Sequence, residues 1–221
     1  MYKIIELKQE DAGVVSIACE VYARVKMGQF TEAIWHCLDI TLSTDEYCRR
    51  RDMAVKCLLD ARTYIYPELH GIGHSYGIGK FRDADLAFDV HQVIRHTNGD
   101  PRSPFSFQEL PKLTCQACQG EMYMLEMPEE QLMVVADACK FYSNIRFGQF
   151  EEIIDLCLDE SEKNYDERRS KSMKALDEAK EYLCPETKGK TLAEIKDSNE
   201  SEFKGAITAD EISTAIFASA K

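Results

Sequence analysis

Apolar residues recur near the start of the chain at the spacing that one face of an α-helix requires. They occupy positions 14, 18, 21, 22 and 25, and a second series follows at 34, 37 and 38. Between the two series stands Gly28-Gln29-Phe30, where a glycine suits the left-handed residue that ends many helices. The pattern therefore predicts two helices joined by a tight turn.

Two further helices and one short strand complete this part of the chain. Ser43-Thr44-Asp45-Glu46 has the form of a capping box, so a third helix is predicted from about Asp45 to Ile65, where Pro67 would stop it. A fourth helix is predicted from about Asp83 to His96. The weak alternation over residues 3–7 predicts a short strand before the first helix.

The same pattern returns about 120 residues later. Residues 4–39 and 124–159 are identical at fifteen of 36 positions, and residues 47–68 match residues 165–186 at nine of 22 after a shift of two residues. This period is too long for a solenoid, so two copies of one small domain describe the sequence better. We call residues 1–97 the first copy, residues 98–119 the linker and residues 120–221 the second copy.

The two copies together predict a mainly α-helical protein. Each copy would hold about four helices and one short strand, and the two would pack as a pseudo-twofold pair, as small domains often do when they dimerise. In the second copy, the strand is predicted at about 123–127. The last helix is predicted at about 209–219, after a capping box at 208–211. The linker contains Asn98-Gly99-Asp100-Pro101 and is predicted to be a long loop.

Charge and composition exclude several classes of function. The chain carries a formal charge of −12. Residues 1–119 hold 14 Lys and Arg against 16 Asp and Glu, and residues 120–221 hold 13 against 23, so the copies carry −2 and −10. This acidity disfavours nucleic acid, because phosphate contacts dominate that affinity. It suits a protein partner with a basic surface, and solubility alone would also explain it.

The expected environment is the cytoplasm. The nine cysteines are odd in number and most lie in helical patterns, which suits reduced, buried thiols. The N-terminal residues lack the long apolar stretch of a signal peptide, and no apolar run reaches the roughly 20 residues of a membrane span. Self-association stays open, since small domains often form symmetric oligomers.

One glycine-rich stretch could bind a phosphate. Four glycines and a lysine precede the fourth predicted helix, and backbone N–H groups in such a loop can surround an anion. The candidate ligand-binding residues are Gly71, Gly73, His74, Gly77, Gly79, Lys80 and Arg82. The spacing fits neither of the common nucleotide-binding motifs. The alternative is a flexible connection between two helices.

Two arginine pairs and one cysteine pair are further candidates. Arg50-Arg51 and Arg168-Arg169 occupy equivalent places on the third helix of each copy, where they either pair with nearby acids or face a shared groove that binds an anion. Cys115 and Cys118 have the spacing of half a zinc knuckle, and a full site needs four ligands. Two reduced linker cysteines are the alternative.

No catalytic constellation and no cofactor motif emerges from the sequence. It contains no nucleophile elbow, zinc-protease helix, kinase signature or P-loop. Trp35 has Asp155 as its counterpart; burial against another helix is expected, and an exposed Trp35 would suit a partner contact. Tyr22 is expected in the core with its hydroxyl bonded, and Gln29 is expected to bond to the backbone of the turn.

Several segments of the first copy and the linker resemble small proteins of unknown function from gut bacteria and their phages. They are Tyr22 with Gly28-Gln29-Phe30, Tyr66–Leu69, Ala87–His96 and Glu109–Leu113. Those proteins usually carry one such unit, so the second copy and the Cys115/Cys118 pair depart from the pattern. The resemblance implies a cytoplasmic, phage-related accessory protein and supplies no functional residues.

The sequence therefore favours a non-enzymatic interaction protein, of the adaptor or inhibitor kind. A counter-defence role in a phage is one form of it. The alternative is a protein that holds a small phosphate-bearing, nucleotide-like ligand in a groove between the two copies, and an enzyme of unfamiliar type comes third.

Overall fold

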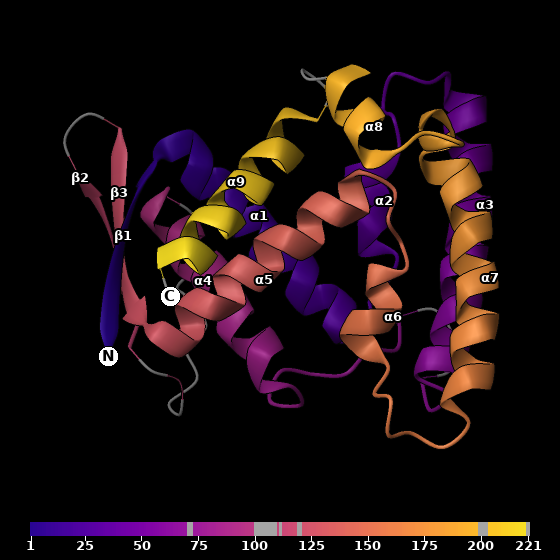
Figure 1. The fold of residues 1–221 in the computed structure, drawn as a ribbon, viewed down its shortest axis with the longest axis horizontal. Coiled ribbons are helices and arrows are strands. Elements are labelled where there is room, and N and C mark those ends of the chain that lie inside the picture. Colours follow the sequence, from indigo (N-terminus) through magenta and orange to yellow (C-terminus); the bar gives the residue numbers. More distant parts are fainter. Residues whose placement is uncertain (70–72, 100–109, 111, 119–120, 199–202, 220–221) are drawn as a thin grey trace. The chain divides into compact units, whose positions relative to one another are not determined.

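The protein is mainly helical and has one small antiparallel sheet (Figure 1). The structure is a computed structural model, and it describes residues 1–69, 73–99, 110, 112–118, 121–198 and 203–219. The elements of the first copy are β1 (Tyr2–Lys8), α1 (Gln9–Lys26), α2 (Glu32–Cys37), α3 (Thr44–Ile65) and α4 (Arg82–Thr97). They are followed by β2 (Thr114–Cys118), β3 (Met122–Pro128), α5 (Glu129–Arg146), α6 (Glu152–Cys157), α7 (Tyr165–Leu183), the 3-10 turn η1 (Pro185–Thr187), α8 (Leu192–Ser198) and α9 (Lys204–Ser219).

The chain folds into two compact units that do not follow chain order. Unit 1 contains Met1–Ala23, Ile78–Ser143 and Lys204–Lys221, and unit 2 contains Arg24–Gly77 and Asn144–Phe203. Each unit thus takes segments from both copies, and the expected linker does not separate the units. No helix in the part of the chain that the structure describes is both long and apolar enough to cross a membrane.

In unit 1, strand β3 lies between β1 and β2, and both pairs are antiparallel. Ile5 lies opposite Leu125, the residue 120 positions further along the chain. Alternate residues of a strand point to opposite faces of the sheet. Leu7, Leu125 and Met127 therefore share the inner face, where they are buried, and both predicted strands are confirmed.

Helices α1 and α5 supply many of the buried residues of unit 1. Small and branched residues are buried around much of each helix, which explains why neither is strongly amphipathic. Tyr22 packs edge-on against Phe141, with ring centroids 5.9 Å apart, and its hydroxyl donates to Asp83 Oδ2 at 3.0 Å. The predicted core position of Tyr22 is confirmed. Cys139 is fully buried, and burial raises the pKa of its thiol to about 12.

In unit 2, helices α3 and α7 lie side by side and run antiparallel. Arg168, near the start of α7, donates to the carbonyl oxygens of Tyr64 and Ile65 at the end of α3, at 2.7 and 2.6 Å. Further along, Ser172 Oγ donates to Ala61 O at 3.5 Å. Buried alanines line both helices, and their small side chains allow the close approach. Ser43 caps α3 as predicted by accepting a bond from Glu46 N.

The tight turns after α1 and α5 require glycine. Gly28 and Gly148 have φ angles of +87° and +77°, the left-handed region that a side chain disfavours. A Cβ atom on Gly28 would lie 2.5 Å from Leu69 Cδ1, and one on Gly148 would lie 2.8 Å from Thr187 Oγ1. The predicted glycine caps are confirmed.

Several expectations differ from the structure. Gln29 Nε2 donates to the Ser75 side chain, and its Oε1 accepts from Arg24, so it does not bond to the turn backbone. Helix α9 begins at Lys204, directly after the buried Phe203 and before the predicted start. The supposed capping box at 208–211 therefore lies inside that helix.

The linker also contains strand β2, where a loop was expected. Pairing with β3 satisfies the backbone of this polar segment, and its own sequence gives no strand pattern. Helix α8 has no counterpart among the predicted elements.

Candidate functional site

Two large apolar side chains lie exposed near the end of α2, in unit 2. Trp35 is 66% exposed and Ile40 is 82% exposed. Helix α2 has only six residues, and its inner side is taken by Ala33 and Ile34, with Leu38 just beyond it. Trp35 therefore points outward, and the expectation that it is buried was wrong. We call Trp35 and Ile40 the Trp35–Ile40 surface.

The second copy builds the same turn with acidic residues. Asp39 Oδ1 accepts a bond from Thr41 N at 2.8 Å, and Asp159 Oδ1 accepts one from Ser161 N at 2.8 Å. The residue at the tip is Ile40 in one turn and Glu160 in the other. Asp155 likewise stands where the first copy has Trp35. The turn after α6 thus forms with acids at both of these positions.

The hydrogen bonds within these turns also keep their aspartates ionised. Bonds from Thr41, first from its backbone N–H, lower the pKa of Asp39. Bonds from Ser161 lower the pKa of Asp159. The tip of each turn therefore lies beside a carboxylate that stays charged at neutral pH.

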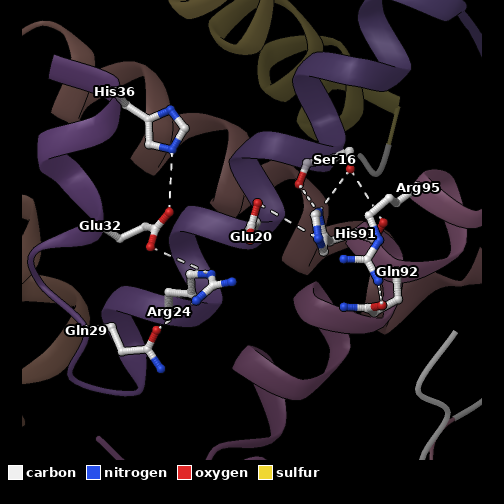
Figure 2. Close-up of polar contacts among 9 residues, drawn as sticks. All are labelled: Ser16, Glu20, Arg24, Gln29, Glu32, His36, His91, Gln92 and Arg95. Carbon is white, nitrogen blue, oxygen red and sulfur yellow. Dashed lines mark hydrogen bonds and ion pairs between the residues drawn. The ribbon is translucent and has the colours of Figure 1, made fainter. Parts of the chain in front are cut away.

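The residues around the Trp35–Ile40 surface carry charges of both signs. Residues 31–46 contain Glu32, Asp39, Asp45 and Glu46 and no Lys or Arg. Arg24 approaches Glu32 at 3.7 Å, and His36 approaches the same carboxylate at 3.9 Å (Figure 2). Burying the exposed part of Trp35 would contribute on the order of 3 kcal/mol to a complex. Arg49 and Arg50 bond to Glu46 in the same way, so the surface joins an apolar anchor to a surround of mixed charge.

A buried polar cluster in unit 1 joins α1 to α4. Ser16 and His91 are 8% and 6% exposed, and His91 Nδ1 lies 3.1 Å from both the hydroxyl and the carbonyl oxygen of Ser16 (Figure 2). His91 Nε2 lies 3.8 Å from Glu20 Oε2. One turn further along α4, Arg95 Nη2 donates to Gln92 Oε1 at 2.5 Å.

Serine, histidine and glutamate together resemble a catalytic triad in composition, and the geometry opposes that chemistry. A carbonyl oxygen can only accept a hydrogen bond, so Nδ1 carries the hydrogen and donates toward Ser16. A ring nitrogen that donates cannot remove the serine proton. The cluster therefore acts as a hydrogen-bonded link between two helices. Sequence reasoning missed it, because Ser16 and His91 are 75 residues apart and each lies in an ordinary helical pattern.

The described glycine-loop residues of unit 2 are held by neighbouring side chains and backbone. Gly73 has a φ of +87°, and the carbonyl oxygen of His74 accepts from Arg62 Nη1 at 2.8 Å. Tyr76 N donates to Met27 O at 2.8 Å, directly before Gly77. Gly71 lies outside the described residues. These contacts fit the connecting role of the loop.

In unit 1, the loop already holds a carboxylate. Gly79 N donates to both carboxylate oxygens of Asp85, at 3.0 and 3.1 Å. Lys80 Nζ lies 5.9 Å from the centroid of the Phe81 ring. Arg82 makes two bonds to Glu130, at 2.7 and 2.9 Å. The N–H of Gly79, which could have cradled a phosphate, is thus directed at an acid of the same chain.

The arginines of α3 have acidic partners on the same helix. Arg50 Nε donates to Glu46 at 2.7 Å, and Arg51 pairs with Asp52 at 2.8 Å. Hydrogen bonds from Arg49 and then Arg50 lower the pKa of Glu46 to about 2. This geometry supports the ion-pair interpretation for the first arginine pair.

The arginines of α7 differ from each other. Arg168 contacts Glu162 besides the two carbonyl oxygens at the end of α3. Arg169 lies 4.0 Å from Asp155 and lines an open groove of about 660 Å³ along α7. Acids outnumber bases in that groove, which is lined by Asp166, Arg169, Ser170, Met173, Lys174, Asp177, Glu178 and Glu181. An anion would meet net repulsion there.

Cys115 and Cys118 lie in strand β2. Three positions apart on a strand, their side chains point to opposite faces of the sheet, whereas a metal needs both sulfur atoms on one side. Burial raises the pKa of the Cys115 thiol, which keeps it protonated. Among the described residues, no group of three or more His, Cys, Asp or Glu is arranged to hold a metal ion. The zinc site stays a prediction.

Comparison with known proteins adds no relative. No protein-family model, no curated protein and no solved structure matches the chain.

Proposed function

We propose that this chain is a non-enzymatic interaction protein that binds a protein partner through the Trp35–Ile40 surface. The observation that carries the proposal is the exposure of these two side chains at positions where the second copy has Asp155 and Glu160. Tryptophan is among the residues that most often dominate binding energy at interfaces. The chain as a whole carries a formal charge of −12, so charge complementarity favours a partner with a basic surface.

The proposal includes a tandem duplication packed as a pseudo-twofold pair. Reciprocal contacts support it in unit 1, where Gln9 N donates to Glu121 O at 2.8 Å and Glu129 N donates to Met1 O at 3.0 Å. Each donor and acceptor has its counterpart 120 residues away. Such an exchange is the mark of a twofold contact.

Unit 2 has a second exchange of the same kind. Cys37 Sγ donates to Ile145 O at 3.5 Å, and Cys157 Sγ donates to Val25 O at 3.7 Å. Cys157 is the counterpart of Cys37, and Ile145 is the counterpart of Val25. The contact therefore supports the duplication independently of the sheet.

Divergence between the copies then gives each surface its own chemistry. The first copy carries the apolar anchor, and the second carries most of the negative charge. An adaptor or inhibitor that acts on a host factor is the form of this function that the resemblance to phage and gut-bacterial proteins favours.

Affinity capture with three matched baits tests the proposal. The baits are the wild-type chain, the double variant Trp35→Asp/Ile40→Glu, and the control Asp155→Asn/Glu160→Gln. We expect a protein partner that wild type and control retain equally and that the double variant loses at least about tenfold, which corresponds to about 1.4 kcal/mol. Recovery of the bait alone at every salt concentration would contradict the proposal. So would equal capture by all three baits.

The phosphate-bearing ligand stays a prediction without an observation that favours it. Gly79 N, Arg82, Arg50 and Arg51 all donate to carboxylates of the chain. A thermal shift with ATP or inorganic phosphate that is absent in Arg82→Gln would revive it.

A further inference from the structure

Strand β1 has one edge that no strand among the described residues covers. In an antiparallel pair, the residues that exchange hydrogen bonds alternate along the strand. Gln9 N donates to Glu121 O, and Glu129 N donates to Met1 O, so the odd-numbered residues of β1 bond to β3. The backbone N–H and C=O groups of Tyr2, Ile4, Glu6 and Lys8 consequently point to the opposite edge.

The corresponding edge of β3 is occupied. The odd-numbered residues of β3 bond to β1, so its even-numbered residues point to β2, where Glu126 lies opposite Thr114 and Met124 lies opposite Gln116. Met124 and Glu126 are the counterparts of Ile4 and Glu6 at the repeat distance of 120. The protein thus shows, on its own sheet, what an edge with this pattern accepts, namely an antiparallel strand.

We propose that the outer edge of β1 binds an extended segment of a partner protein as an additional antiparallel strand. The segment is defined by its backbone hydrogen bonds and by its side chains. Its backbone would bond to Ile4 and Glu6 in the way that β2 bonds to Met124 and Glu126. Strand addition at a free edge is a common mode of peptide recognition, in which main-chain bonds supply affinity and alternate side chains supply specificity.

The side chains of β1 specify the segment further. Tyr2 and Ile4 are 51% and 59% exposed and share one face of the sheet with Glu6 and Lys8. Cross-strand neighbours on one face contact each other. The segment therefore carries apolar residues opposite Tyr2 and Ile4, a Lys or Thr opposite Glu6, and an acid opposite Lys8. Within the protein's own sheet, Thr114 of β2 lies opposite Glu126 of β3 and is an example of such a pair.

Charged residues on β1 restrict what can pair with it. Lys3, Glu6 and Lys8 lie within the seven residues of this strand, and charges on an edge strand disfavour indiscriminate pairing. The edge therefore selects a segment with the complementary charges. This inference goes beyond the proposed function, because it concerns a second surface, in unit 1, and does not require Trp35 or Ile40.

The test uses the full chain, labelled with nitrogen-15, and a capped peptide Glu-Ala-Lys-Ala-Val-Ala-Val. Its alternate residues match Lys8, Glu6, Ile4 and Tyr2 in antiparallel order. We expect the peptide, at millimolar concentration, to shift the amide signals of Tyr2, Ile4 and Glu6 and to slow their hydrogen exchange. The same peptide N-methylated at alternate residues, so that it cannot donate to β1, is expected to cause no shift.

The matched variants are Ile4→Pro and Ile4→Thr. Proline removes the Ile4 N–H, which points to the free edge, so pairing with β3 is kept and peptide affinity falls at least about tenfold. Threonine keeps that N–H and is expected to bind within about threefold of wild type. The amide signals of β3 report whether the proline variant is folded.

Three results would overturn the inference. The first is no shift in β1 of the wild type, and the second is equal shifts with the N-methylated peptide. The third is self-association of the wild type without peptide, measured by light scattering and lost in Ile4→Pro, since a second copy would then occupy the edge. Peptide binding in Trp35→Asp/Ile40→Glu is expected to be unchanged, so failure here and failure of the proposed function are distinguishable.

Discussion

Arg168 at the start of α7 donates to the carbonyl oxygen of Ile65 at the end of α3, 2.6 Å away. The last carbonyl groups of a helix lack partners inside the helix, and a cation there also meets the negative end of the helix dipole. One side chain therefore ends α3 and joins it to α7. Its sequence counterpart, Arg50, pairs instead with Glu46 on its own helix.

We expect Arg168→Met to lower the free energy of unfolding by about 1–3 kcal/mol, because it leaves carbonyl groups of α3 without their charged donor. Urea denaturation measures the change. Arg50→Met is the control and should cost at most about 0.5 kcal/mol, since an ion pair four positions apart on one helix contributes little. Equal losses in both variants would mean that Arg168 acts only as a surface charge.

The glycine turns give a second stability prediction. Gly148→Ala should destabilise the protein by about 2–4 kcal/mol, because a left-handed backbone is strained for alanine and the new Cβ would lie 2.8 Å from the buried Thr187 Oγ1. Gly189→Ala, at a φ of +72° with nothing within 4 Å of the added Cβ, separates the two causes and should cost only about 1 kcal/mol. Thermal unfolding that shows no difference between the two variants would rule out the steric contribution.

Asp89 predicts a pH dependence of stability. Burial raises the pKa of its carboxyl above the ordinary value of 3.8, while a bond from Gln131 opposes that shift. The folded protein therefore binds the proton more tightly than the unfolded chain, and stability falls as pH rises from the ordinary pKa through the raised one. Asp89→Asn should raise the free energy of unfolding at pH 7 and change little well below pH 4.

Asp39 serves as a control, because its pKa is shifted in the opposite direction to that of Asp89. Its pKa is lowered by the Thr41 bonds, so its contribution is present above the ordinary pKa and is lost as pH falls through the lowered one. Asp39→Asn should therefore destabilise at pH 7 and be neutral in acid. Denaturation at a series of pH values gives the free energy of unfolding of both variants as a function of pH. If the free energies of Asp89→Asn and wild type differ by the same amount at every pH, the role of burial is refuted.

The exposed apolar pair gives a prediction about folding alone. Trp35→Asp and Ile40→Glu introduce the residues that the second copy has at these positions, so each should change the free energy of unfolding by less than about 0.5 kcal/mol. Calorimetry measures it. Ile34→Asp, one residue away and buried, should cost at least about 3 kcal/mol. A large loss in Trp35→Asp would show that the tryptophan serves the core.

Local signals explain what the sequence could predict. Apolar spacing and the residues that start and stop helices are encoded within a few positions, so α1, α3 and the turns at Gly28 and Gly148 were predictable. Strand β2 was not, because Thr114–Cys118 lacks apolar alternation and owes its extended form to pairing with β3. The contact between Ser16 and His91 depends on packing across 75 residues, which no local pattern records.

The candidate site was predictable only in part. The sequence singled out Trp35, because the second copy has Asp155 at that position. Its exposure was not predictable, since it follows from the short length of α2. The outer edge of β1 could not be predicted without the register between β1 and β3. The bonds of Gln9 N and Glu129 N show which residues of β1 bond to β3 and which point away from it. The glycine loop is the opposite case. Its composition suggested a bound phosphate, and in the structure Gly79 N donates to the carboxylate of Asp85 instead.

The single Trp35–Ile40 surface has a consequence for stoichiometry. A symmetric dimer of one small unit would present its apolar anchor twice, and a multivalent partner would be cross-linked into larger assemblies. Here one turn ends in Ile40 and the other in Glu160. If the proposed function holds, the described part of each chain offers one such anchor, and the complex with a partner would be a closed one-to-one complex.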